Sequence, residues 1–138
     1  MRVETQLSAF LENKAGTLAA LAADLGRHAV NIRALTIANL TDHAVVRFVV
    51  SDPQKALHLL GERGVLVVAS DVLAVDMPDR PGALAIVTRQ LARAGVNINY
   101  AYGSVPAVQA EAVVYLHVSD LKKARAALTR SRRRRRRR

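Results

Sequence analysis

The sequence contains no cysteine and no tryptophan, and only 4% of its 138 residues are aromatic. The absence of cysteine excludes disulfide bonds, thiol catalysis and cysteine-based zinc sites. A core must therefore be built from Val, Leu, Ile and Ala, and the apolar fraction of 51% is ample for one. No apolar stretch is long enough to span a bilayer, and the first residues lack the pattern of a signal peptide. We therefore expect a soluble, cytoplasmic protein.

The formal net charge is +10, but most of the excess lies at one end of the chain. Arg132–Arg138 supply seven of the 21 basic residues, which leaves 14 basic against 11 acidic residues, a net +3. The rest of the chain therefore does not predict a polyanion partner. Three interpretations of the tail stay open: an appended C-terminus, an electrostatic arm for nucleic acid or anionic surfaces, and a disordered overhang. We favour the overhang, with salt-sensitive polyanion binding as a secondary property.

The chain repeats itself. Asn13–Ile32 and Asp79–Ile98 align at an offset of 66 residues and are identical at eight of 20 positions. At an offset of 68, Ala44–Val46 matches Ala112–Val114, so the second copy has two extra residues between its second and third strands. This degree of self-similarity indicates a duplication.

Each copy predicts the order β-α-β-β-α-β, which is the ferredoxin-like split unit. The expected strands are 3–11, 32–40, 44–50 and 65–69 in the first copy, and 72–77, 98–103 and 112–118 in the second. Ser51-Asp52-Pro53 is a strong helix start signal. Because only Ser70-Asp71 separates the copies, we predict an α+β fold of two units in tandem. Their antiparallel sheets carry helices on one face and join into one extended sheet.

We place the first unit at residues 1–70, the second at 71–130, and a disordered poly-Arg tail at 131–138. At the offset of 68, residues 65–69 correspond to 133–137, so arginines stand where the second copy needs its closing strand. A strand of arginines would crowd like charges together. We therefore expect an uncovered sheet edge in the second unit unless a partner chain pairs with it.

Two turns have the features of a small-molecule site: Leu11–Thr17 and Met77–Ala83, each between the first strand and first helix of its copy. Gly16 and Gly82 let the backbone approach a ligand or another chain. The helix start that follows offers unpaired N–H groups and a partial positive charge, which suit a carboxylate. The alternative is that both glycines serve only tight packing.

Polar side chains near these turns suit a zwitterion. Asn13 and Asp79 can take the amino group of a ligand. Asn31 and Asn97, just before the second strand of each copy, can both donate and accept. The alternative is that these asparagines merely tolerate a left-handed turn.

These residues carry a resemblance to a known family. Glu12–Leu18 followed by Val30-Asn31-Ile32, and Asp79–Leu84 followed by Gly95–Ile98, resemble the ACT domain. Phe10–Lys14, Asn31–Leu35 and Asp71–Val75 are similar to the small stand-alone tandem ACT proteins of bacteria, over roughly residues 3–128. The resemblance implies a non-catalytic, amino-acid-sensing regulator without a cofactor.

In the family, ligands typically lie between two ACT units, held by the first loop of one unit and the second strand of the other. Carried over by position, the resemblance implicates Asn13, Ala15 and Gly16 with Asn97 and Ile98. A reciprocal site would use Asp79, Pro81 and Gly82 with Asn31 and Ile32. Two departures make the sites unequal: Ala15 replaces the usual proline, and Asp79 replaces an asparagine and so disfavours an acidic ligand.

No other feature predicts catalysis or a metal site. The four histidines, 28, 43, 58 and 117, lack ligand spacing, and no Ser-His-acid set converges on one loop. Tyr100 and Tyr102 share one strand face and either border the pocket near Asn97 or simply pack. We expect a free amino acid as ligand, a homodimer or partner enzyme, and no membrane. The alternatives are a protein that binds nucleic acid or another polyanion through Arg132–Arg138, and a purely structural dimerisation module.

Overall fold

The computed structural model describes residues 1–39, 41–104 and 111–136. By its internal contacts the chain divides into an N-terminal unit, Glu4–Asp71, and a C-terminal unit, Met1–Val3 with Val72–Arg138. The elements in chain order are β1 (Arg2–Glu12), α1 (Thr17–Arg27), β2 (Ile32–Asn39), β3 (His43–Val50), α2 (Pro53–Glu62), β4 (Leu66–Pro78), α3 (Ala83–Arg93), β5 (Ile98–Ser104), β6 (Glu111–Val118) and α4 (Leu121–Arg136). The α+β class and the ferredoxin-like order of the elements are confirmed.

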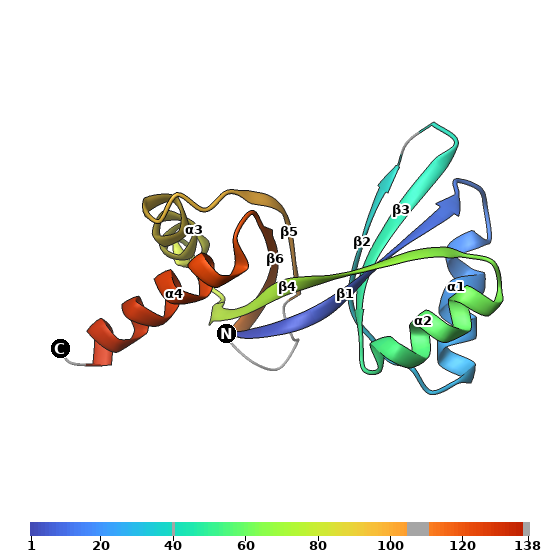
Figure 1. The fold of residues 1–138 in the computed structure, drawn as a ribbon, viewed down its shortest axis with the longest axis horizontal. Coiled ribbons are helices and arrows are strands. Elements are labelled where there is room, and N and C mark those ends of the chain that lie inside the picture. The colour runs from blue at the N-terminus through green and yellow to red at the C-terminus, as the bar shows by residue number, and fades with distance from the viewer. Residues whose placement is uncertain (40, 105–110, 137–138) are drawn as a thin grey trace. The chain divides into compact units, whose positions relative to one another are not determined.

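In the N-terminal unit the strands lie in the order β2-β3-β1-β4. β3 pairs antiparallel with both β1 and β2, and α1 and α2 cover one face of these strands (Figure 1). Alternate residues of the strands point toward the helices and form the core. That core contains Leu7, Ala9, Leu11, Leu21, Leu25, Val30, Val46, Phe48, Val50, Ala56 and Leu60.

The C-terminal unit has the matching order β5-β6-β4, with the start of β1 next to β4. β6 pairs antiparallel with β4 and β5, and α3 and α4 lie against each other (Figure 1). Its core contains Leu73, Val75, Met77, Ala83, Leu91, Val96, Ala112, Leu116, Val118, Ala124 and Leu128. Both cores consist mainly of aliphatic side chains, as the composition predicted.

The expected open edge of the second unit is not present, because the start of β1 takes the place of the closing strand. Met1 and Val3 pack against the core of the C-terminal unit. The Arg2 guanidinium donates to both carboxylate oxygens of Asp76, at 3.2 and 3.3 Å. An unpaired edge would expose the N–H and C=O groups of β4. The chain's own first residues therefore satisfy this edge, and no partner chain is required for it.

Two further segments differ from expectation. The arginine tail was expected to be disordered, whereas α4 continues to Arg136. Arginine is a good helix former, and a helix spreads like charges around its surface, which a strand cannot do. Ser70-Asp71 was expected to separate two strands, whereas β4 runs through them without a break. There, the buried Gln6 donates from Nε2 to Ser70 Oγ at 3.4 Å.

The start of α2 follows its predicted signal, whereas one helix end does not follow from the sequence. Asp52 accepts a hydrogen bond from the Lys55 N–H at 3.1 Å, with Pro53 in the first turn of α2. α1 and α3 end alike: Val30 N–H donates to Leu25 O at 2.9 Å, and Val96 N–H donates to Leu91 O at 3.0 Å. The residue that turns the chain is Gly95 at φ +70° after α3, but Ala29 at φ +58° after α1. Only glycine adopts this left-handed conformation without a steric penalty.

We therefore predict that Ala29→Gly stabilises the protein by about 1 kcal/mol, because the left-handed penalty of alanine exceeds the entropy cost of glycine. The midpoint of thermal unfolding, followed by circular dichroism, should rise by roughly 3–5 °C. Gly95→Ala is the matched control and should lower the midpoint by a similar amount. A lower midpoint for Ala29→Gly would contradict this account of the helix end.

Candidate functional site

The strand-to-helix turns predicted as ligand loops have the same geometry in both units. Gly16 precedes α1 at φ +89°, and Gly82 precedes α3 at φ +84°. No side-chain hydrogen bond caps either helix, and neither first turn contains an acidic residue. A Cβ added at either glycine would meet no atom within 4 Å in the described structure. The glycines are therefore required for the left-handed backbone and not for tight packing, which was the alternative interpretation.

This geometry leaves the first-turn amides of both helices available to a ligand. An α-helix has no internal acceptors for its first N–H groups, and its N-terminus carries a partial positive charge. Thr17 N–H donates to Lys14 O at 3.4 Å, and Ala83 N–H donates to Arg80 O at 3.3 Å. Both distances are long for a hydrogen bond of this kind. These long bonds close the turns but use one amide each. A carboxylate can bind the rest.

The turn of the N-terminal unit borders a hollow of about 290 Å³. Its lining residues are Leu11, Glu12, Asn13, Lys14, Thr17, Leu18, Ile37, Asn39, Ala44 and Val46. The exposed Asn13 is held by its backbone, because its N–H donates to Asp42 O at 3.2 Å. Thr17 Oγ1 is buried without a hydrogen-bond partner among the described residues. The hollow thus combines an apolar wall with polar groups from one loop, as small-molecule sites usually do.

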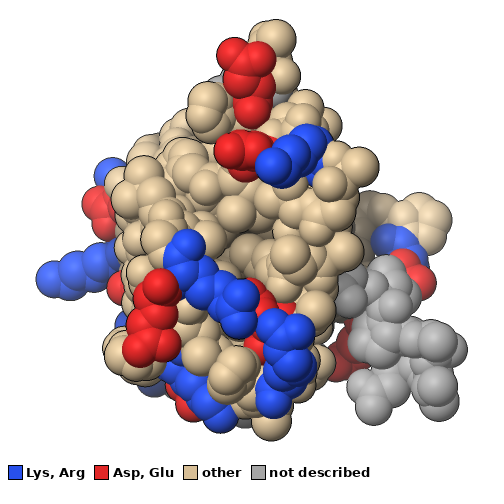
Figure 2. Space-filling view, turned by 90° about the vertical axis from the view of Figure 1, so that its right-hand side faces the viewer, with Lys and Arg blue, Asp and Glu red and all other residues tan. Residues whose placement is uncertain are grey.

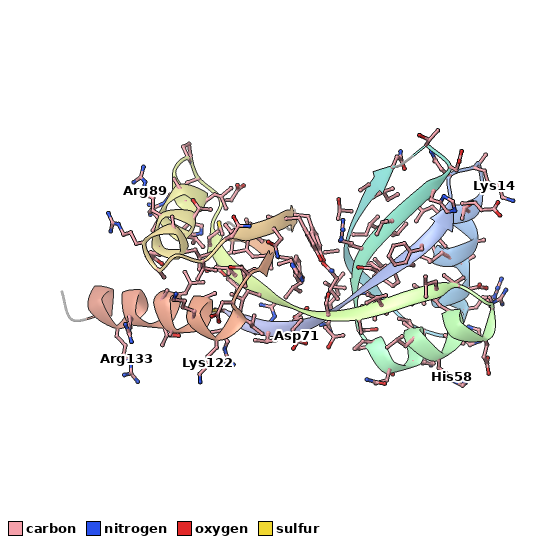
Figure 3. All side chains as sticks on the ribbon, turned by 45° about the horizontal axis from the view of Figure 1, so that its top comes forward. Lys14, His58, Asp71, Arg89, Lys122 and Arg133 are labelled. Atoms are coloured by element: carbon pink, nitrogen blue, oxygen red, sulfur yellow. The ribbon has the colours of Figure 1, made fainter. Side chains whose placement is uncertain are left out.

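The charges at the two turns differ. Lys14 Nζ lies 2.9 Å from Glu12 Oε2, and Figure 3 labels Lys14 at the end of β1. The hydrogen bond from Lys14 lowers the pKa of the Glu12 carboxyl, and the same bond raises the pKa of Lys14. In the C-terminal unit Pro78 takes the place of Glu12, and no carboxylate in the described parts pairs with Arg80. The cation of the first turn, Lys14, is therefore neutralised by Glu12, whereas the cation of the second turn, Arg80, is not.

The asparagines before β2 and β5 are held by serines that the sequence interpretation missed. Asn31 N–H donates to Ser51 Oγ and Ser51 N–H donates to Asn31 O, both at 2.9 Å. Asn97 and Ser119 make the same two bonds, also at 2.9 Å. The repeat contained a signal for these pairs, because asparagine and serine recur together in both copies. The backbone of each asparagine is fixed while the residue stays exposed.

Beyond these pairs the two strands differ. Asn97 Nδ2 donates to Asn99 Oδ1 at 3.0 Å, and Asn99 Nδ2 lies 3.0 Å from His117 Nδ1. Tyr100 stacks on His117, with ring centroids 4.7 Å apart, and Tyr102 stacks on Tyr115 at 5.4 Å. The tyrosines therefore pack across β5 and β6, which was the simpler of their two interpretations.

The sequence family described as an ACT domain pair matches residues 1–131. The chain belongs to the ACT domain pair family. A search of curated protein sequences finds no match to it. Among solved structures, protein BT0572 from Bacteroides thetaiotaomicron is similar at 36% identity and a TM-score of 0.89, over 94% of this chain and 89% of that chain.

The fold of this ACT domain pair is shared with more distant proteins. The ligand-free regulatory subunit of aspartate kinase from Thermus thermophilus has 16% identity and a TM-score of 0.70, over 96% of this chain and 97% of that chain. The corresponding subunit from Thermus flavus has 17% identity and a TM-score of 0.64, over 93% and 92%. ACT domains are regulatory and bind small molecules, and family membership gives this chain a regulatory, ligand-binding role at that level of detail.

Within one unit the ACT pair does not bring all the predicted site residues together. Asn13 and Asn31 lie at opposite ends of α1, whose eleven residues span about 16 Å. Ile32 and Ile98 pack against the cores of their units, so each can offer a ligand mainly its backbone. Ala15 and Pro81 are exposed in the turns. The pairing of each loop with the asparagine of the other unit, implied by the family resemblance, stays a prediction.

Two other findings concern chemistry outside the turns. In residues 1–39, 41–104 and 111–136, no group of three or more His, Asp or Glu side chains is arranged to hold a metal ion. None of the helices in the same ranges is long and apolar enough to cross a membrane.

Proposed function

We propose that this ACT domain pair is a non-catalytic regulatory protein that binds a free amino acid at its two glycine turns. The observation that carries the proposal is the duplicated left-handed glycine. This glycine, at φ +89° in one unit and +84° in the other, precedes a helix that has no side-chain cap. A geometry kept in both copies, with first-turn amides left open, suits the carboxylate common to all amino acids.

The ammonium group of the ligand has acceptors of two kinds. As the family resemblance implies, the first is the asparagine of the other unit, and the side chains of Asn31 and Asn97 are exposed on backbones that Ser51 and Ser119 hold in place. The turns add Asn13 in one unit and Asp79 in the other. Because Asp79 carries a full negative charge, its site favours a free ammonium group and disfavours an acidic side chain. We therefore propose two sites of unequal affinity.

A regulatory role needs a partner whose contact with the chain changes when the ligand binds. Two structures that share this fold are named as regulatory subunits of aspartate kinase. By analogy, we propose that the partner is an enzyme or a second copy of this chain. The analogy supports no particular enzyme or amino acid, because fold alone does not specify function.

The test is a screen of the twenty amino acids by thermal shift on the full chain. At a concentration about one hundred times the dissociation constant, a ligand adds about 2.7 kcal/mol of stability, which is several degrees in the unfolding midpoint. We expect one or a few amino acids to do so. If none shifts the midpoint of the folded protein at about 10 mM, only the dimerisation module or the polyanion binder remains.

Variants then locate the sites. Asn31→Ala and Asn97→Ala should each weaken one site about tenfold, because each removes a donor and an acceptor from a ligand. The matched control is Gln54→Ala, which removes an exposed amide from α2 without touching a turn. Equal loss of affinity in the control would contradict the assignment of the asparagines.

A second candidate function rests on α4. Lys122 and Arg133 project from this helix (Figure 3), and it carries the charge of the tail as far as Arg136. On the face shown in Figure 2, by contrast, basic and acidic side chains are intermixed around a broad uncharged surface. A helix that carries many cationic side chains is suited to bind a polyanion.

We predict that removing residues 131–138 abolishes retention on heparin at low salt while amino-acid stabilisation survives. The salt at which the full chain elutes measures the electrostatic contribution. Loss of the amino-acid effect on truncation would instead place the tail in the regulatory function.

A further inference from the structure

A second hollow recurs at the same place in both units, on the helix side of the sheet. In the N-terminal unit its lining includes Leu11, Thr17, Ala20, Leu21, Asp24 and Leu60. In the C-terminal unit the corresponding residues of the repeat line it: Met77, Ala83, Ile86, Val87, Gln90 and Leu128. Of the turn, Met77, Pro78, Arg80 and Ala83 line this hollow, whereas Asp79, Pro81 and Gly82 do not, and neither does Asn97. The hollow therefore adjoins the proposed amino-acid site without including its polar side chains.

In the N-terminal unit the charged groups at this hollow satisfy one another. Asp24 is only 5% exposed and pairs with Arg27 and with Arg63, whose Nε lies 2.8 Å from Asp24 Oδ2. α2 ends at Glu62, and the chain then turns back so that Val65 also lines the hollow. A buried carboxylate with two cationic partners has no need of a ligand.

In the C-terminal unit the same place is an apolar cavity of about 120 Å³. The neutral Gln90 replaces Asp24, and α4 continues as a helix where α2 ends. Met1, which precedes β1 as Val65 precedes β4, lines the cavity in place of Val65. The walls include Val75, Met77, Ile86 and Val87. The cavity is partly open to solvent beside the exposed Arg80, so a ligand can enter it.

A single unpaired cation borders this cavity. Arg80 lines it and is exposed, and no carboxylate of the described residues pairs with its guanidinium. Asp76 also lines the cavity, but its charge is compensated by Arg2 at 3.2 Å and by the Met1 ammonium at 3.6 Å. The cavity therefore joins an apolar interior to a net positive rim.

We propose that this cavity is a second binding site, for a short branched aliphatic carboxylate. An apolar cavity of about 150 Å³ accommodates benzene, so about 120 Å³ suits an alkyl group of four or five heavy atoms. The alkyl group lies among Met77, Ile86 and Val87, and the carboxylate binds Arg80 in the two-bond geometry that guanidinium favours. The site takes its ligand without an ammonium group, which distinguishes it from the amino-acid site.

The experiment is a methyl NMR titration of the full chain with isovalerate. We expect saturable shifts of the Ile86 and Val87 methyl signals, and weaker binding of both acetate, which lacks the alkyl group, and 3-methylbutan-1-ol, which lacks the charge. Arg80→Gln should weaken isovalerate binding about tenfold, since it removes the charged partner. Lys14→Gln, at the equivalent position of the other unit, should leave binding unchanged.

Filling the space tests the cavity itself. Ile86→Phe should abolish isovalerate binding, whereas Ala20→Phe at the equivalent position of the N-terminal unit should not. The proposal is overturned if isovalerate at about 20 mM leaves the Ile86 and Val87 methyls unshifted, or if Arg80→Gln binds as wild type does. Asn97→Ala should bind isovalerate normally, so failure of the amino-acid site and failure of this site are distinguishable.

Discussion

The left-handed conformation of one glycine in each unit, Gly16 and Gly82, directs the chain from the first strand into the first helix. An L-residue with a side chain would be strained there by about 1–2 kcal/mol. The turn leaves the helix start open to solvent, holds Asn13 or Asp79 beside it, and sets the direction of α1 or α3 over the sheet. The core and the candidate site of each unit thus depend on the same backbone conformation.

The duplication conserves this scaffold and varies the chemistry placed on it. In both units a serine holds the backbone of an asparagine in place through two reciprocal hydrogen bonds of 2.9 Å. At the turns, however, Lys14 is neutralised by Glu12, whereas Arg80 has no such partner among the described residues. Duplicated units of this kind can keep one fold while binding ligands of different charge.

Much of the fold could be predicted from the sequence, because the patterns that predict its strands and helices occur in both copies of the repeat. Glycines, the Asp52-Pro53 helix start and the alternation of apolar residues predict elements from local physics. Contacts between distant residues were not predicted, which is why the start of β1 beside β4 and the serines behind Asn31 and Asn97 were missed. Ala29 was missed as a left-handed residue because its side chain gives no sign of that conformation.

The most direct test of the glycine turns as ligand sites is a ¹⁵N NMR titration with the amino acid that stabilises the chain most. The account predicts that the largest shifts fall on the open first-turn amides, Leu18 and Ala19 of α1 or Leu84 and Ala85 of α3, because the carboxylate binds there. Shifts confined to α4, or spread evenly over both sheets without the turns, would contradict it.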